Sequence, residues 1–279
     1  MSEGTALDKT GPNLLIRDNT LKHLLATPVS ARKDTRLMTG DSGPTPAERK
    51  QWEDLGYLVF EEAISGDSLV RLQRAFDYWA EACKEEWLGR IAKGEAAATY
   101  YDIPNTLEKD DIFIDILDRP RYYRYIRAFA GDDALVIGEQ VRTAPVWPTS
   151  YTGWHPDVPP SHPLHIKVQV YVNDVEPGAG EFAFVPGSHR PGAGPYPRVK
   201  NLAAMPGHKR FAGKAGTAIM FNSYGWHVAM ENHTATPRKS IILIYEKRTS
   251  DRVAENENRF ASISHALNTP ERRRLFGIS

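Results

Sequence analysis

LHIKVQVYVNDV, residues 164–175, is the stretch that decides the fold. Apolar residues at 166, 168, 170 and 172 alternate with Lys167, Gln169 and Tyr171, and successive side chains of a strand point to opposite faces of a sheet. The stretch therefore predicts a central strand with one apolar and one polar face. A polar face inside a sheet protein implies either solvent or a lined cavity on that side, and both interpretations stay open here.

Similar strand-like runs flank this stretch on both sides. They are ALVIGEQVRTAPV (134–146), GEFAFVPGSH (180–189), GTAIMFNS (216–223) and KSIILIYEKR (239–248). Five or more short strands at close spacing, separated by Gly and Pro, predict a β-sandwich or jelly roll. The chain is therefore expected to be mainly β, with helices on its flanks.

The region before these strands is expected to be helical. Thr45 and Glu48 form a capping box around Pro46, which predicts a helix from there to about Leu55, ended by Gly56. A short strand at 57–62, a long amphipathic helix at 67–92 and a helix at 121–130 should follow.

This pattern gives the expected organisation of the chain. Residues 1–44 form a polar arm, with a short helix near Asn19–Leu25. Residues 45–279 form one domain, with a helical cover at 45–133, a jelly-roll core at 134–250 and a helical tail at 251–279.

Composition excludes several partner classes. Lys plus Arg equals Asp plus Glu at 35 each, so nothing favours a nucleic acid or an anionic membrane as partner. No apolar run reaches membrane-spanning length, and MSEGTALDKTG lacks the layout of a signal peptide. Cys83 is the single cysteine, which excludes an intrachain disulfide and favours a cytoplasmic location. We interpret Cys83 as a small helical residue.

Two histidines and one carboxylate are candidate metal ligands: His155 and Asp157 in WHPD, and His227 in YGWHVAMENH. In an extended segment residues i and i+2 project to the same side, so one ion can bind His155 and Asp157 together. His227 follows the strand-like TAIMF (217–221), and a non-adjacent strand of a jelly roll can bring it to the same point. Two imidazoles and a carboxylate on one face of a metal leave the opposite positions open, as in non-haem Fe(II) oxygenases.

These histidines also have interpretations in which they bind no metal. A His-x-acid pair arises about once by chance in a chain of this composition. His227 could be a hydrogen-bonded core histidine, and His233 competes with it as the distal ligand. We interpret His189 as a structural brace of the PGSH loop. His162 and His165 follow the ligand pair closely, and either could support a ligand or face a substrate.

Arg238 and Ser240 open the strand RKSIILIYEK, eleven residues after His227. Strand geometry places both on one side. An arginine fork with a neighbouring hydroxyl is a good receptor for a carboxylate, because the guanidinium binds it bidentately and stays charged when buried. A dicarboxylic co-substrate held there could reach the metal with its other end. The alternative for Arg238 is an exposed charge at the start of a strand.

Over about residues 45–248 the sequence resembles the phytanoyl-CoA dioxygenase-type Fe(II)/2-oxoglutarate oxygenases. The matching segments are TPAERKQWEDLGYLVFEEAIS (45–65), WHPD, VNDVEPGAGEFAFVPGSHRPG (172–192) and AGTAIMFNSYGWHVAMENHTATPRKSIILIYEKR (215–248). The resemblance implies a cupin-like double-stranded β-helix, or jelly roll, covered by N-terminal helices. It also implies an oxidoreductase that uses Fe(II), 2-oxoglutarate and O₂ to oxidise a small-molecule substrate, most often by hydroxylation, with release of succinate and CO₂.

The resemblance assigns roles to these residues. His155, Asp157 and His227 bind iron, while Arg238 with Ser240 holds the far carboxylate of 2-oxoglutarate. Because Asp157 is present, halogenation is disfavoured.

Two glutamines are further candidates for binding the co-substrate. Gln169 stands where the family often has Trp beside the co-substrate, and this departure leaves its role open. Gln140 lies on the strand before the ligand loop and is a candidate for the same pocket.

Aromatic residues cluster in sequence around both ligand segments. They are Trp147, Tyr151, Trp154, Tyr224 and Trp226. They either line an apolar substrate pocket or fill the end of the sandwich. The substrate candidates are Trp154, Tyr224, Trp226 and Lys167.

Two other functions compete with the oxygenase. One is a cupin-like metal enzyme that does not use 2-oxoglutarate, and the other is a non-catalytic jelly-roll binding protein. The cupin-like enzyme has no use for the Arg238 and Ser240 pair, and the binding protein would not turn over a co-substrate. The sequence carries no signal for the oligomeric state.

Overall fold

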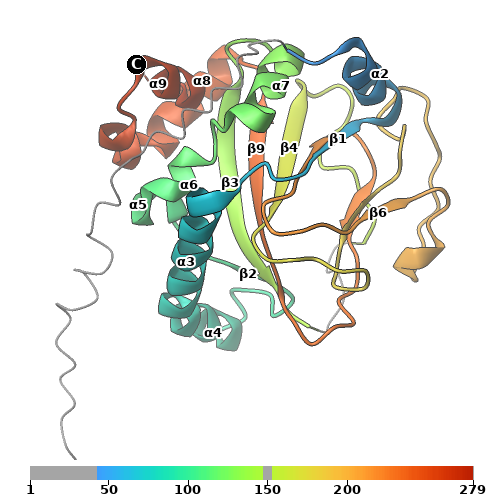
Figure 1. Cartoon of the computed structure of the whole chain (residues 1–279), viewed down its shortest axis with the longest axis horizontal. Coiled ribbons are helices and arrows are strands. Elements are labelled where there is room, and N and C mark those ends of the chain that lie inside the picture. The colour runs from blue at the N-terminus through green and yellow to red at the C-terminus, as the bar shows by residue number, and fades with distance from the viewer. Residues whose placement is uncertain (1–42, 147–152, 279) are drawn as a thin grey trace, which may run out of the picture. The chain divides into compact units, whose positions relative to one another are not determined.

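The computed structural model describes residues 43–146 and 153–278, which belong to one compact unit (Figure 1). The expected helix near Asn19–Leu25 and nearly all of the expected arm lie outside these residues. The division into cover, core and tail of a single domain stays a prediction.

The larger sheet has six antiparallel strands in the order β1-β7-β4-β9-β3-β2. The strands are β1 (Tyr57–Phe60), β2 (Tyr101–Asp102), β3 (Leu135–Ala144), β4 (His165–Tyr171), β7 (Ala218–Asn222) and β9 (Arg238–Glu246). The strand of the opening sequence, β4, pairs with β7 on one side and β9 on the other. Its central place explains why its apolar face is fully buried.

The smaller sheet has three antiparallel strands in the order β6-β5-β8. They are β5 (Phe182–Phe184), β6 (Lys209–Phe211) and β8 (His227–Ala229). A buried aromatic cluster from both sheets joins them, with Tyr171 and Phe221 on one side and Phe182, Phe184 and Phe211 on the other. The two sheets therefore pack face to face through the side of β4 that carries its polar residues.

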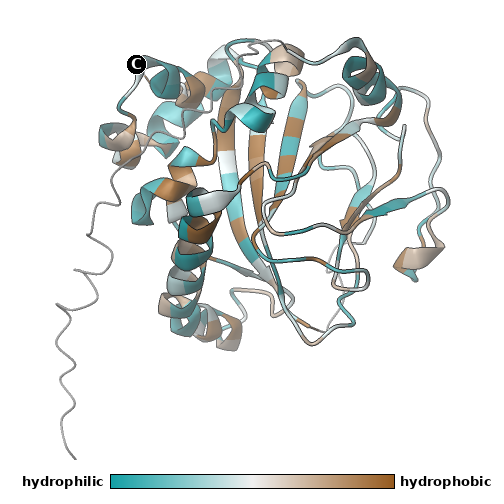
Figure 2. Ribbon diagram, in the orientation of Figure 1, coloured by the Kyte–Doolittle hydropathy of each residue, from teal (hydrophilic) through white to brown (hydrophobic). Residues whose placement is uncertain are grey.

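Helices cover the opposite face of the larger sheet (Figure 1). The helices before the core are α2 (Pro46–Leu55), α3 (Gly66–Ala82), α4 (Lys84–Ala92), α5 (Thr106–Lys109), α6 (Asp111–Asp115) and α7 (Pro120–Ala130). The later ones are α8 (Ser250–Arg259), η2 (Ala261–Ala266) and α9 (Pro270–Phe276). The short helix η1 (Leu202–Ala204) lies elsewhere, because its Leu202 belongs to the same buried cluster as Ala183 of β5 and Val228 of β8. Figure 2 shows apolar and polar bands alternating along the central strands, as two differently covered faces require. No helix of the described ranges is both long and apolar enough to cross a membrane.

The predicted capping box is confirmed. The Thr45 side chain accepts from the Glu48 backbone N–H at 3.2 Å, and the Glu48 carboxylate accepts from the Thr45 backbone N–H at 2.8 Å. The helix ends where expected, because Gly56 adopts the left-handed conformation (φ 80°) that favours glycine. A Cβ there would also lie 2.5 Å from the His189 ring, so the turn and the PGSH loop pack directly together.

The expectation of one helix over 67–92 is wrong. The chain forms α3 and α4, which meet at Cys83 (φ −99°, ψ 2°). The change of direction brings Trp87 of α4 against Tyr101 of β2, with ring centroids 5.0 Å apart. Apolar periodicity does not record a bend at one residue, and Cys83 is buried at the junction.

Other expected elements agree within a few residues. The helix at 121–130 begins one residue earlier, at Pro120, and the strand at 57–62 ends at Phe60. The short elements β2, α5 and α6 were not expected, because two to five residues are too few to show a period.

Candidate metal centre and its cavity

The structure brings the three candidate ligands together. His155, Asp157 and His227 each offer one ligand atom, and these atoms all lie within 4.8 Å of one another. His155 and His227 form an antiparallel bridge in which each backbone N–H donates to the other residue's carbonyl, at 3.2 and 3.0 Å. The Asp157 N–H donates to Ser223 O at 3.0 Å. The backbone itself therefore holds the ligand loop against the start of β8.

Both imidazoles have a defined tautomer. His155 Nδ1 lies 2.8 Å from Gly153 O, and His227 Nδ1 lies 3.0 Å from Gly225 O. A carbonyl can only accept, so each Nδ1 carries the hydrogen and each Nε2 presents a lone pair. Gly225 must be glycine for this arrangement, since a Cβ there would lie 2.2 Å from the Phe184 ring.

The donor atoms fit a divalent metal. His227 Nε2 lies 3.3 Å from Asp157 Oδ2, and His155 Nε2 lies 3.9 Å from Asp157 Oδ1. Two lone-pair acceptors at 3.3 Å repel unless a cation lies between them, and metal bonds of about 2.1 Å at right angles place neighbouring ligand atoms about 3 Å apart. Asp157 Oδ2 is buried and has no hydrogen-bond partner among the described residues. An oxygen left in this state is a ready metal ligand.

Electrostatics keep the ligands in their binding forms. Burial, followed by the charges of His155 and Lys167, lowers the pKa of His227 to about 4, although Asp157 opposes this shift. Burial alone would raise the pKa of Asp157, but His227 and Lys167 outweigh it and hold the pKa below its usual value. A neutral imidazole and an ionised carboxylate are the forms that bind a metal.

Lys167 contacts this centre directly. Its Nζ donates to Asp157 Oδ1 at 2.6 Å, and both side chains are largely buried. One carboxylate oxygen is thus held by an ammonium group and the other faces His227. This division leaves Oδ2 as the oxygen available to a metal.

A cavity of ≈ 160 Å³ opens beside the three ligands. It is lined by Gln140, Arg142, His155, Asp157, Lys167, Gln169, Phe182, Phe221, His227, Val228, Ala229, Arg238 and Ile242. Of the two interpretations of the polar face of β4, the lined cavity is therefore correct.

Of the two residues of the expected carboxylate receptor, Arg238 lines this cavity. Arg238 is buried and donates to Gly180 O, so it is not an exposed strand-start charge. Ser240 lies two residues on along β9 and is not among the residues that line the cavity, and its buried Oγ has no hydrogen-bond partner within the described residues. Gln169 does line the cavity, and its buried Nε2 likewise has no hydrogen-bond partner there. These polar groups remain available to a ligand.

The aromatic substrate candidates are placed differently. Trp154 is buried in an apolar cluster, donates from its indole N–H to Leu202 O at 2.9 Å, and is not among the residues that line the cavity. Trp226 packs on Tyr196 at the edge of this cluster, with ring centroids 5.5 Å apart. The Tyr224 hydroxyl donates to His162 O at 2.6 Å. Of the four substrate candidates, Lys167 alone is in the lining; Trp147 and Tyr151 lie outside the described residues.

The other histidines considered from the sequence, His162, His165, His189 and His233, are not part of the ligand cluster. His233 lies 3.2 Å from Glu231 at the surface. His189 Nε2 lies 3.2 Å from Glu53 O, which makes its ring a brace between the PGSH loop and α2. His162 and His165 pack edge to face, with ring centroids 6.0 Å apart, next to the ligand loop.

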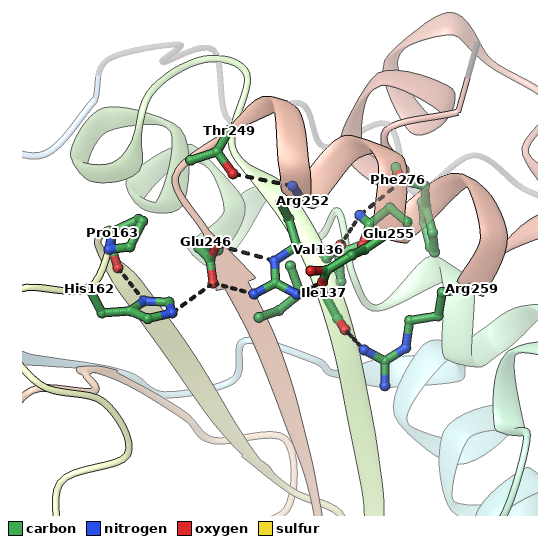
Figure 3. Close-up of polar contacts among 11 residues, drawn as sticks. Val136, Ile137, His162, Pro163, Glu246, Thr249, Arg252, Glu255, Arg259 and Phe276 are labelled. Carbon is green, nitrogen blue, oxygen red and sulfur yellow. Dashed lines mark hydrogen bonds and ion pairs between the residues drawn. The ribbon is translucent and has the colours of Figure 1, made fainter.

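A buried ion pair ties this loop to the C-terminal tail (Figure 3). Arg252 of α8 donates to both carboxylate oxygens of Glu246 at 3.2 Å, and His162 Nε2 lies 3.9 Å from the same carboxylate. Since His162 also accepts from Tyr224, the chain on either side of the ligands is connected to the end of β9.

Arg142 was not singled out from the sequence. It lies in the cavity lining on β3, donates to both oxygens of Asp102 at 2.6 and 2.7 Å, and has its guanidinium carbon 3.9 Å from the centroid of the Tyr100 ring. Its position two residues after Gln140 was the available signal, because residues i and i+2 of a strand share a face.

The chain is similar to a curated relative and to several solved structures over part of its length. Over 160 residues it is 24% identical to an ectoine dioxygenase of Nocardia farcinica, covering 47% of this chain and 54% of that protein. The chain thus spans about half the length of that curated relative. EctD from S. alaskensis with bound Fe has a TM-score of 0.54 at 22% identity, over 74% of this chain and 78% of that one. The epimerase SnoN, in complex with Fe³⁺, alpha ketoglutarate and nogalamycin RO, has a TM-score of 0.51 at 20% identity, over 71% and 81%.

The structural likeness confirms the predicted fold, a mainly β jelly-roll core with flanking helices. Residues 52–240, more than half of the chain, match the family Phytanoyl-CoA dioxygenase (PhyH). The matched stretch contains all three converging ligands as well as Arg238 and Ser240. The chain belongs to the phytanoyl-CoA dioxygenase family.

Proposed function

We propose that the protein is an Fe(II)/2-oxoglutarate-dependent dioxygenase that hydroxylates a small organic substrate. The observation that carries this proposal is the convergence of two Nε2 lone pairs and one unpartnered carboxylate oxygen at a cavity that also contains a buried arginine. The overall reaction consumes 2-oxoglutarate and O₂ and yields succinate, CO₂ and a hydroxyl group in place of a C–H hydrogen.

Each group of residues has its own part in the proposal. His155, Asp157 and His227 would hold the iron, and the iron would activate O₂, the oxidant, with 2-oxoglutarate as the electron donor. Arg238 binds the far carboxylate of 2-oxoglutarate and Ser240 adds a hydroxyl. These residues orient the co-substrate, while the apolar lining excludes water from the reacting carbon.

Two glutamines complete the co-substrate pocket. Gln169 and Gln140 both pair in register with Ile242 of β9, one from each side, and all three line the cavity. We assign them to polar contacts along the body of 2-oxoglutarate, where an amide can donate to a carboxylate oxygen.

One anaerobic titration tests the function. Fe(II) followed by 2-oxoglutarate should produce a weak visible charge-transfer band in the wild type, and Asp157→Ala should abolish it. Metal binding without such a band would favour a cupin-like enzyme that needs no oxo-acid. Absence of metal binding would favour a non-catalytic jelly-roll protein. Either of these results would refute the proposal.

A further inference from the structure

The cavity carries more positive than negative charge. Arg142, Lys167 and Arg238 line it, and Asp157 is the one acid among the described lining residues. Glu181, the residue before β5, is also buried but does not line the cavity. Its carboxylate accepts a hydrogen bond from the Gly178 N–H at 2.8 Å. The excess of cations therefore belongs to the cavity itself.

Two of the three cations are balanced once the proposed cofactors are bound. Arg142 is neutralised by its two hydrogen bonds to Asp102. Iron(II) and Arg238 together carry three positive charges, which Asp157 and the 2-oxoglutarate dianion match. The count over the described lining residues leaves one net positive charge at Lys167, because its partner Asp157 is also counted against the iron.

Bulk water solvates the ammonium group of Lys167 only in small part. Its side chain is 13% exposed and projects from the centre of β4 toward the smaller sheet. Its carboxylate contact, Asp157, would be shared with the metal. A buried ammonium without a full counter-charge is costly, so a ligand that brings one negative charge next to it is stabilised.

We propose, resting on the proposed function, that Lys167 makes the site select a substrate that carries a carboxylate. One remaining positive charge matches a monoanion, and a phosphate dianion would leave an excess negative charge. The Lys167 ammonium lies 2.6 Å from the carboxylate of Asp157, one of the three candidate metal ligands. The acid group therefore binds beside the metal centre, and the oxidised C–H lies only a few bonds from the carboxylate carbon.

The experiment uses pairs of small acids and their amides. Propanoate, cyclohexanecarboxylate and 3-phenylpropanoate, each with its primary amide, are titrated anaerobically into the protein loaded with Fe(II) and excess 2-oxoglutarate. The readout is the shift of the visible charge-transfer band. An acid that displaces 2-oxoglutarate abolishes the band, whereas one that binds beside it shifts the band, so the two modes are distinguished.

We expect at least one acid to shift the band at a concentration tenfold or more below that of its amide. Lys167→Met should bring this ratio to about one, and Lys167→Arg should retain it. The matched control is Lys239→Met on the neighbouring strand, where the ammonium lies 2.6 Å from Asp77, away from the cavity lining. This control should keep the wild-type ratio.

Other results overturn the inference. It fails if no acid acts at lower concentration than its amide in the wild type, including a panel in which nothing binds. It also fails if Lys167→Met, checked for folding and Co(II) binding, keeps the preference. If the band never forms, the proposed function fails and the inference with it. If the band forms and the acids show no preference, the inference alone fails.

Discussion

Arg238 is buried at the start of β9, with its guanidinium among the groups that line the cavity. If it binds the far carboxylate of 2-oxoglutarate, Arg238→Ala should raise the dissociation constant of the co-substrate at least 30-fold, since losing one partner of a buried charge pair costs about 2–5 kcal/mol. Binding of Co(II) to the three ligands should change by no more than about threefold. Isothermal titration with each ligand in turn measures both effects.

Arg210→Ala is the matched control for this prediction. Arg210 is exposed on β6 and lies outside the cavity lining, so its removal should leave both dissociation constants unchanged. Unaltered 2-oxoglutarate binding in Arg238→Ala would refute the anchor assignment.

His165 should make the fold sensitive to acid. Burial and the charge of Lys167 lower its pKa to about 4 from the ordinary 6.5. Between these values the unfolded chain binds the proton and the folded chain resists it, so the stabilising effect is complete above pH 6.5 and is lost as the pH falls toward 4. The loss attributable to His165 between pH 7 and pH 5 should be about 2 kcal/mol.

Urea unfolding of the metal-free protein at pH 7 and pH 5 measures this effect. His165→Gln should lose about 2 kcal/mol less than the wild type over the same interval. Equal losses in the two proteins would show that other groups control the acid response.

At the scale of residues, the sequence predicts the functional residues that belong to a motif or that share one face of a strand. His155, Asp157 and His227 stand in recognisable segments, and Arg238 with Ser240 follows from spacing along one strand. The aromatic residues could not be assigned in the same way. Whether Trp154 faces a cavity or Leu202 depends on how the loops pack, and sequence proximity to a ligand does not encode that.

At the scale of elements, the tail helix α8 is joined to β9 by the pair Arg252 and Glu246 (Figure 3). Arg252→Ala should destabilise the fold by about 3 kcal/mol, because the Glu246 carboxylate is 3% exposed and would lose its cationic partner. The double variant Arg252→Met with Glu246→Leu should recover most of this loss, since an apolar pair avoids the cost of burying charge.

Chemical unfolding of the wild type, the single variant and the double variant provides the measurement. A single variant as stable as the wild type would mean that the contact contributes nothing. The control is Lys50→Ala, which removes an exposed pair with Asp54 and should cost less than about 1 kcal/mol.

Element prediction follows from the strength of the local signal. The capping box at Thr45 fixed the start of α2 to the residue, because the same atoms that form the motif satisfy the first free N–H groups. The junction at Cys83 left no such signal. It arises from the contact of Trp87 with Tyr101, residues that meet only after the chain has folded.

At the scale of the whole molecule, metal binding should stabilise the fold. Co(II) at 100 times its dissociation constant adds about 2.7 kcal/mol to a protein that binds it only when folded. For a protein of this size the melting temperature should rise by roughly 5–10 °C. Asp157→Ala should show no such rise, and a chelator should reverse it in the wild type.

Differential scanning fluorimetry with Co(II), followed by EDTA, checks this expectation. A matching rise in Asp157→Ala would place the stabilising metal elsewhere. His233→Ala serves as the control, since His233 lies at the surface beside Glu231 and should leave the rise intact.

The predictions that concern the whole molecule were drawn from several sequence segments that follow one another in a particular order. The family and the jelly-roll fold are confirmed, and the oxidoreductase class with iron and 2-oxoglutarate belongs to the proposed function. They could be predicted because WHPD, the PGSH loop and the segment around His227 occur together and in that order. The substrate is not encoded in this way, because it depends on the volume and charge of a cavity that many distant residues form.

The reciprocal backbone bridge between His155 and His227 has a consequence for metal identity. Since peptide hydrogen bonds already align both imidazoles, an incoming ion has little chain to reorganise, and the geometry of the apoprotein should not exclude neighbouring first-row ions in favour of ferrous iron. Intrinsic affinity would then follow the Irving–Williams order, with nickel and copper ahead. Correct loading would depend on which ions the surroundings supply, and purification over nickel resin would tend to give mismetallated, inactive protein.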